Sequence, residues 1–134
     1  MSYVAIADAI QTKLLTITDI NIVYNHEPKE LVEYPAATIS ARSHTNAFND
    51  LCANVRRYVF IIRLYFRTDV AQDAETVLRD LADQVITIIE ADPTIGGSCD
   101  FAIPTSGSWS FQTREVPVKV VEILVEARKR VERI

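Results

Sequence analysis

The sequence predicts an α+β domain in which one mixed or antiparallel sheet of about five strands carries two helices on one face. Three observations predict it. Two segments repeat apolar residues at helical spacing, one segment alternates them as a strand does, and the elements follow the order α-β-β-β-α-β-β. We expect residues 1–134 to form a single domain, because this length suits one hydrophobic core and no internal repeat or linker divides it.

The N-terminal part predicts a helix and two strands. Residues 2–15 place Tyr3, Ile6, Ile10 and Leu14 on one apolar stripe, and Ser2 suits the N-cap position. The β-branched stretch at 20–24 predicts a short strand. Residues 34–40 predict the next strand, which begins with a proline that suits a first or edge position.

Residues 41–55 are polar, with Phe48 and Leu51 as the large apolar side chains. This composition predicts a long hairpin loop, or an arm that projects from the body of the domain. Loops of this length are uncommon in compact domains and often carry function. We therefore expect Phe48 and Leu51 to anchor the arm on another protein, the alternative being a disordered loop.

The clearest strand lies at 56–67. One parity is entirely apolar or aromatic and predicts a face toward the core; it comprises Tyr58, Phe60, Ile62, Leu64 and Phe66. The other parity becomes mixed from Arg63 onward. Arg63, Tyr65 and Arg67 stand together on this second face, where they fit either a protein interface or an ordinary solvated surface.

The clearest helix follows at 69–91, where apolar residues keep helical spacing for about five turns. It ends at Asp92-Pro93, and Gly96-Gly97 turns the chain. Two more strands are predicted at 108–114 and 116–127, and the charged tail 128–134 is expected to fray. Trp109 fits core packing, with an interface anchor as the alternative.

Charge and hydropathy exclude several classes of function. The net charge is −4 and the pI is near 5.1, which disfavours direct nucleic-acid readout, although Arg56 and Arg57 form a local basic pair. No apolar run is long enough to predict a membrane helix, and no leader is recognisable, so the cytoplasm is the simplest predicted location.

The sequence offers no catalytic, cofactor or metal motif. His26 and His44 fall in predicted polar connections, away from any metal-ligand spacing. Gly96-Gly97 follows a helix and lacks the pattern of a phosphate-binding loop. We expect a protein that is not an enzyme and has no cofactor. Its predicted contact residues are Phe48, Leu51, Arg56, Arg57, Arg63, Tyr65 and Arg67.

The pattern as a whole resembles a known family. The carrying features are Ile22-Val23-Tyr24, Tyr34-Pro35-Ala36-Ala37-Thr38-Ile39, the polar hairpin, the aromatic strand Tyr58–Phe66, the long helix, Asp92-Pro93 with Gly96-Gly97, and a Val-rich last strand. In this the chain resembles the tail terminator (tail completion) proteins of long-tailed bacteriophages and prophages.

That resemblance implies a structural protein of the virion tail, assembled in the host cytoplasm. Such subunits form a hexameric ring on the last ring of tail-tube protein, stop tube growth and provide the surface for head attachment. The implied partners are other copies of the chain, the tail-tube protein and a head-completion or connector protein. Two alternatives remain: a head-tail connector or stopper protein, and a small ligand-binding or enzymatic domain.

Overall fold

The computed structural model describes residues 2–31, 33–48, 53–68, 74–113 and 116–132. Its elements are α1 (Ser2–Leu15), β1 (Ile22–Tyr24), β2 (Ala36–Phe48), β3 (Ala53–Arg67), α2 (Ala74–Glu90), β4 (Phe101–Thr113) and β5 (Pro117–Glu132). The predicted order α-β-β-β-α-β-β is confirmed, as is a single mixed sheet of five strands.

The strands lie in the order β1-β2-β3-β5-β4. The short β1 pairs parallel with β2, and the other neighbours are antiparallel. β4 therefore forms one edge of the sheet. Because β1 covers only the start of β2, at Ala36–Thr38, the rest of β2 forms the other edge among the described strands.

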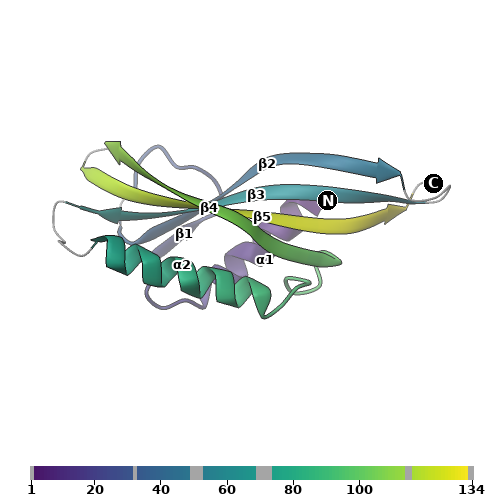
Figure 1. The fold of residues 1–134 in the computed structure, drawn as a ribbon, viewed down its shortest axis with the longest axis horizontal. Coiled ribbons are helices and arrows are strands. Elements are labelled where there is room, and N and C mark those ends of the chain that lie inside the picture. Colours follow the sequence, from purple (N-terminus) through teal and green to yellow (C-terminus); the bar gives the residue numbers. More distant parts are fainter. Residues whose placement is uncertain (1, 32, 49–52, 69–73, 114–115, 133–134) are drawn as a thin grey trace.

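Both helices pack on the same face of the sheet, as predicted (Figure 1). The apolar stripe of α1 contributes Ile6, Ile10 and Leu14 to the core. The stripe of α2 contributes Leu78, Leu81, Ala82, Val85 and Ile89. Under them lies the aromatic and aliphatic parity of β3, from Tyr58 to Leu64. Each such buried side chain contributes roughly 1.5–3 kcal/mol, so this face holds the domain together.

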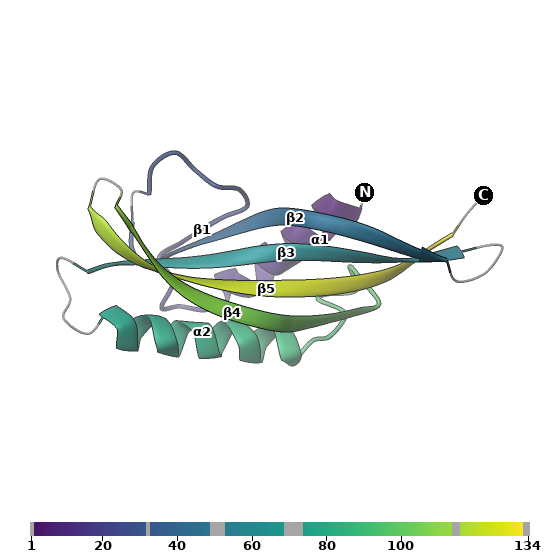
Figure 2. The same cartoon turned by 45° about the horizontal axis from the view of Figure 1, so that its top comes forward.

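The opposite face, which we call the open face, carries no helix among the described residues (Figure 2). The connection 25–35 crosses one end of it. There Leu31 packs with Tyr65, Val118 and Val120 in a second, smaller apolar cluster. The cluster explains why β3 is buried on both faces near its C-terminal end.

At the other end of the molecule, β2, β3 and β5 run on past α2 and the beginning of β4 (Figures 1 and 2). We call this extension the arm and define it as residues 42–48, 53–59 and 126–132; the first residues of β4 still pair with 126–128, and beyond them the arm has three strands. The ladder of β2 and β3 continues to Phe48↔Asn54, with an irregularity between Ala41 and Ser43. The described residues of 41–55 therefore form strands, and our prediction of a loop there is wrong.

The C-terminal tail is also more ordered than predicted. We expected 128–134 to fray, but β5 extends to Glu132 and pairs with β3 as far as Ala53. The polar arm has solvent on much of both faces, so its sequence lacks the apolar alternation that marks a strand. Backbone pairing holds it instead, with β3 in the middle of the arm bonded to both β2 and β5. Leu51 and residues 133–134 lie outside the described residues.

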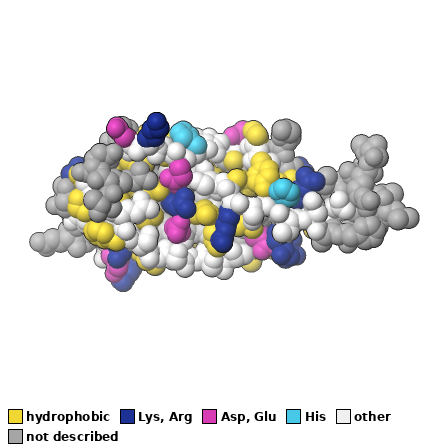
Figure 3. Space-filling model, turned by 90° about the horizontal axis from the view of Figure 1, so that it is seen from above, with side chains coloured by type: hydrophobic (Ala, Val, Ile, Leu, Met, Phe, Trp, Pro, Cys, Tyr) yellow, Lys and Arg dark blue, Asp and Glu magenta, His cyan; other side chains and the backbone are white. Residues whose placement is uncertain are grey.

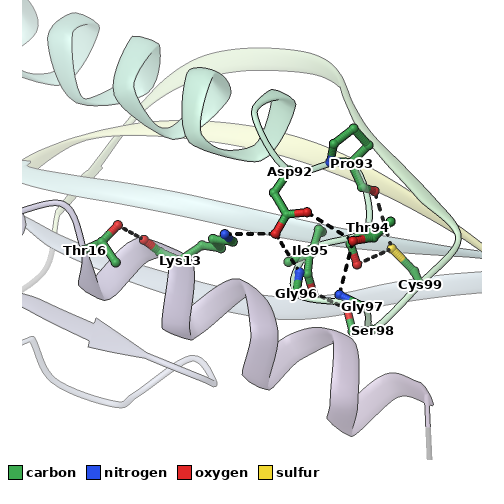
Figure 4. A network of polar contacts seen from close by, with 10 residues as sticks. All are labelled: Lys13, Thr16, Asp92, Pro93, Thr94, Ile95, Gly96, Gly97, Ser98 and Cys99. Carbon is green, nitrogen blue, oxygen red and sulfur yellow. Dashed lines mark hydrogen bonds and ion pairs between the residues drawn. The ribbon is translucent and has the colours of Figure 1, made fainter.

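The turn between α2 and β4 is organised by Asp92 (Figure 4). Its Oδ2 accepts hydrogen bonds from the Gly96 amide at 2.8 Å and from Nζ of Lys13 at 2.9 Å, and its Oδ1 accepts one from Thr94 at 3.1 Å. Gly96 and Gly97 have φ values of 66° and 84°, which glycine adopts without strain. α2 ends at Glu90, ahead of Pro93, and the glycines turn the chain after it as predicted. Lys13 ties the turn to α1.

Candidate protein-protein interface

The edge strand β4 lacks charged residues, although Pro104 and an irregularity in its pairing between Pro104 and Ser106 interrupt it. None of its residues is charged between Phe101 and Thr113, although natural edge strands commonly carry charges that prevent pairing with other chains. Its apolar side chains are exposed as well: Phe101, Ile103, Trp109 and Phe111 range from 42% to 60% exposed. Such an edge is suited to accept a strand from another protein.

The exposed side chains lie on both faces of β4. Trp109 and Phe111 are opposite Val121 and Lys119 of β5, on the helix side of the sheet. Trp109 borders a groove of about 380 Å³ between β4 and α2, which Arg79 and Ile86 also line. Phe101 and Ile103 lie opposite Arg128 and Glu126, on the open face. Trp109 is 42% exposed, so our preference for core packing was wrong.

An ion-pair network occupies the middle of the open face. The guanidinium of Arg63 donates from NH1 to Glu27 at 2.9 Å and from Nε to Glu122 at 2.6 Å. Glu27 also accepts hydrogen bonds from Thr38 Oγ1 at 2.5 Å and from the Tyr65 hydroxyl at 3.0 Å. Figure 3 looks onto this face and shows basic and acidic side chains next to one another across its middle.

Electrostatics strengthen this network. Burial raises the pKa of Glu27, but hydrogen bonds from Thr38, Arg63 and Tyr65 outweigh it and hold that pKa below its ordinary value. Burial lowers the pKa of Arg63, and its two carboxylate partners reverse that effect and raise it. The network therefore fastens the connection that carries Glu27 to the sheet.

The arm carries a second polar and aromatic cluster, on its helix side. The Tyr3 hydroxyl lies 2.8 Å from Nδ1 of His44, and the Tyr3 ring packs edge-on against Tyr58 at 4.8 Å. Arg56 donates from Nε to Asn46 at 2.8 Å and from NH1 to the Tyr58 hydroxyl at 3.2 Å. These contacts fix the arm to the N-terminal end of α1. His44 lies in a strand, and the polar connection expected there is wrong.

The predicted contact residues divide into two groups. Arg63, Tyr65 and Arg67 lie at the body end of β3, where Tyr65 is only 1% exposed and Arg63 bridges two carboxylates. Tyr65 therefore offers no surface to a partner, and we correct that expectation. Arg56 and Arg57 lie in the arm, and Arg57 pairs with Glu126 at 2.5 Å while remaining 49% exposed. The Phe48 side chain and Leu51 lie outside the described residues.

Two observations concern metal binding and thiol chemistry in the described part of the chain. No three His, Cys, Asp or Glu side chains among the described residues lie close enough to hold a metal ion. Cys99 is buried, and that burial raises the pKa of its thiol, which makes it a poor nucleophile. Neither described helix is long and apolar enough to cross a membrane.

Comparison with known proteins does not identify a family. No protein-family model matches the chain, and a search of curated proteins finds no match.

Two features of the surface escaped the sequence analysis. The exposed edge of β4 was missed because alternation in a strand does not tell whether the strand has one neighbour or two. The absence of any charge between Phe101 and Thr113 was the available signal. The partnership of Arg63 with Glu27 depends on the path of the connection 25–35, which no local pattern encodes.

Proposed function

We propose that the chain is a tail terminator: a structural subunit that assembles with other copies into a ring, hexameric as the family resemblance implies, and caps the tail tube of a long-tailed phage or prophage. In that role it stops tube growth and forms the surface to which a head-completion or connector protein binds. Its place is the virion tail, after assembly in the host cytoplasm. It needs no substrate and no cofactor.

The observation that carries the proposal is the edge of β4. A strand of 13 uncharged residues with four exposed apolar side chains is a hazard in a free monomer, because unpaired backbone groups recruit other chains. It is useful in a protein whose final state is an assembly. We assign this edge to the contact with the last ring of the tube, where a strand of the tube protein would extend the sheet.

The resemblance to tail terminators supports the same proposal. It rests on the order of the elements and on residues from Ile22 to the last strand, and the fold has that element order. The alternative of a head-tail connector uses the same surfaces on a different partner. Binding to tube ends separates the two functions.

The test mixes the purified chain with tail tubes built from the tube protein of the same phage or prophage, followed by negative-stain imaging. The wild type should cap tube ends. A Trp109→Ser/Phe111→Ser variant should fold but leave the ends bare. Val4→Ser, which removes an exposed apolar side chain from α1, is the matched control and should cap normally. Tubes left bare by the folded wild type would reject the terminator function.

A further inference from the structure

The charges of the chain are unevenly distributed, although the protein as a whole is acidic. The arm contains six basic residues and two acidic residues, Glu126 and Glu132. The basic residues are Arg42, Arg56, Arg57, Arg128, Lys129 and Arg130. Arg57 and Arg128 both pair with the single carboxylate of Glu126, which leaves an excess of positive charge on the arm.

The open face of the arm combines this charge with apolar surface. Arg57 lies opposite Arg128, and Val55 lies opposite Arg130, so these four side chains share one face. Val59 lies opposite Glu126 on the same face. The three arginines are exposed and the two valines half-buried. The arm therefore presents apolar side chains beside guanidinium groups.

A surface that complements the arm in charge and apolar character lies along α2, on the side away from β4. Two adjoining hollows of about 510 and 600 Å³ lie there, and we call them together the α2 groove. Its floor is largely apolar and includes Ile17, Pro35, Phe66, Val77, Leu81 and Ile88. Gln84 joins the two hollows by donating to Asp19 at 3.2 Å and to Asp80 at 2.9 Å.

Carboxylates line the α2 groove. Asp19, Asp80 and Asp83 are all exposed, and none of the described residues that line either hollow is basic. The α2 groove thus has the opposite charge to the arm and a similar apolar content. The two surfaces share no residue, so a contact between them joins unlike parts of two copies. A contact of this heterologous kind forms a closed ring when the rotation between copies closes.

We infer that the arm of one copy docks in the α2 groove of the next, with Arg57, Arg128 and Arg130 facing Asp19, Asp80 and Asp83. The inference deepens the proposed function, on which it rests, by assigning the contact between copies. The edge of β4 then remains available for the tube. Opposite charges across such a contact select the head-to-tail arrangement, because arm against arm and groove against groove both repel.

The experiment uses sedimentation velocity of the full chain and three variants. The arm variant is Arg57→Glu/Arg128→Glu, and the groove variant is Asp19→Lys/Asp80→Lys, because Asp83 also lines the hollow on the β4 side. Arg79→Glu is the matched control, because Arg79 is on α2 but lines the hollow on the β4 side. Cooperative melting of each variant verifies that it is folded.

The wild type and Arg79→Glu should self-associate to the same extent at low salt. Self-association should fall at about 1 M salt, where the Debye length is about 3 Å. The arm and groove variants should each associate at least about tenfold more weakly, because each places like charges across the contact. A mixture of the two variants should associate again, because the intact arm meets the intact groove and the reversed arm meets the reversed groove. A chain with all four substitutions should associate again.

Two results overturn the inference. Folded arm and groove variants that assemble as the wild type does would show that other surfaces join the copies, while a ring and tube capping would still support the proposed function. A wild-type chain that stays monomeric at the highest attainable concentration also overturns it. The terminator function is then tested separately, by whether that monomeric chain caps tubes.

Discussion

Arg63 on β3 holds Glu27 of the covering connection 2.9 Å from its NH1 atom, across a face of the sheet that no described helix covers. The same guanidinium binds Glu122 of β5 at 2.6 Å. One side chain therefore links the connection to two central strands. Since this side chain is only 24% exposed, solvent screens the network less than it screens a surface pair.

Arg63→Met is expected to lower the free energy of unfolding by about 2 kcal/mol, because it leaves two neighbouring carboxylates without their shared cation. Urea denaturation of the purified chain measures it. Arg79→Met is the matched control: Arg79 is 65% exposed and pairs with Glu75 within one helix turn, so its loss should cost less than about 0.5 kcal/mol. Equal effects of the two substitutions would mean that the Arg63 network adds nothing beyond a surface pair.

Glu27→Gln should change how stability depends on pH. The folded-state pKa of Glu27 is lowered, so its contribution is complete above the unfolded-state pKa and is lost as pH falls through the folded-state value. The wild type should therefore lose stability on the acid side more steeply than Glu27→Gln. Urea midpoints measured between neutral and acid pH give both curves. Glu30→Gln, an exposed position of the same connection, should follow the wild type; parallel curves for Glu27→Gln and the wild type would refute the prediction.

Asp92 should control a second acid transition. Hydrogen bonding to Lys13 and then to the Gly96 amide lowers the pKa of Asp92 to about 2. Because the folded-state pKa is depressed, its contribution is complete above about pH 4 and is lost as pH falls toward 2. Asp92→Asn should remove this dependence, as thermal melts across that pH range would record. An unchanged acid profile in Asp92→Asn would contradict the role given to the turn.

Gly96→Ala tests the same turn through its backbone. A Cβ at Gly96 meets nothing within 4 Å, so the cost comes only from the φ value of 66°. We expect a loss of about 1 kcal/mol in the free energy of unfolding, measured by urea denaturation. Gly107→Ala is a contrasting control. Gly107 lies in β4 without a positive φ, so its substitution tests the contact of the new Cβ with the Glu122 carbonyl oxygen at 3.4 Å and not backbone strain. A Gly96→Ala chain as stable as the wild type would show that the turn relaxes.

Phe111→Ser should leave the free energy of unfolding within about 0.5 kcal/mol of the wild type, because the side chain is 60% exposed in the subunit. Its effect should appear only when the edge of β4 meets a partner, as weaker binding to tube ends in a co-sedimentation assay. Phe60→Ser, which opens a cavity under α1, should instead cost about 3 kcal/mol or more. A large loss of monomer stability in Phe111→Ser would place that side chain in the core.

The fold could be predicted because its signals are periodic. The stripe of α2 and the apolar parity of β3 both face one core, so each local pattern agrees with the tertiary arrangement. Each element buries one face, and this produces the periodic apolar pattern from which the buried residues could be predicted. Pro93 likewise marked the end of α2, and the glycines at positive φ marked the turn that follows it.

The arm and the candidate interface could not be predicted to the same depth. Residues 42–48 form a strand through backbone pairing, while the side chains of residues 42–46 are exposed, so nothing in their polarity distinguishes strand from loop. Tyr65 looked like a surface residue because its parity also contains Arg63. It is buried because the connection 25–35 packs over it, a tertiary contact that the local sequence of β3 does not encode. Trp109 is exposed because β4 has a single neighbour among the described strands.

Assembly on a tube end is the central claim, and the length of growing tubes measures it most directly. Tube protein polymerised with increasing amounts of the wild-type chain should yield progressively shorter tubes, each closed at one end by a ring. Tubes that reach the same lengths with and without the folded chain, and that carry no ring, would contradict the account.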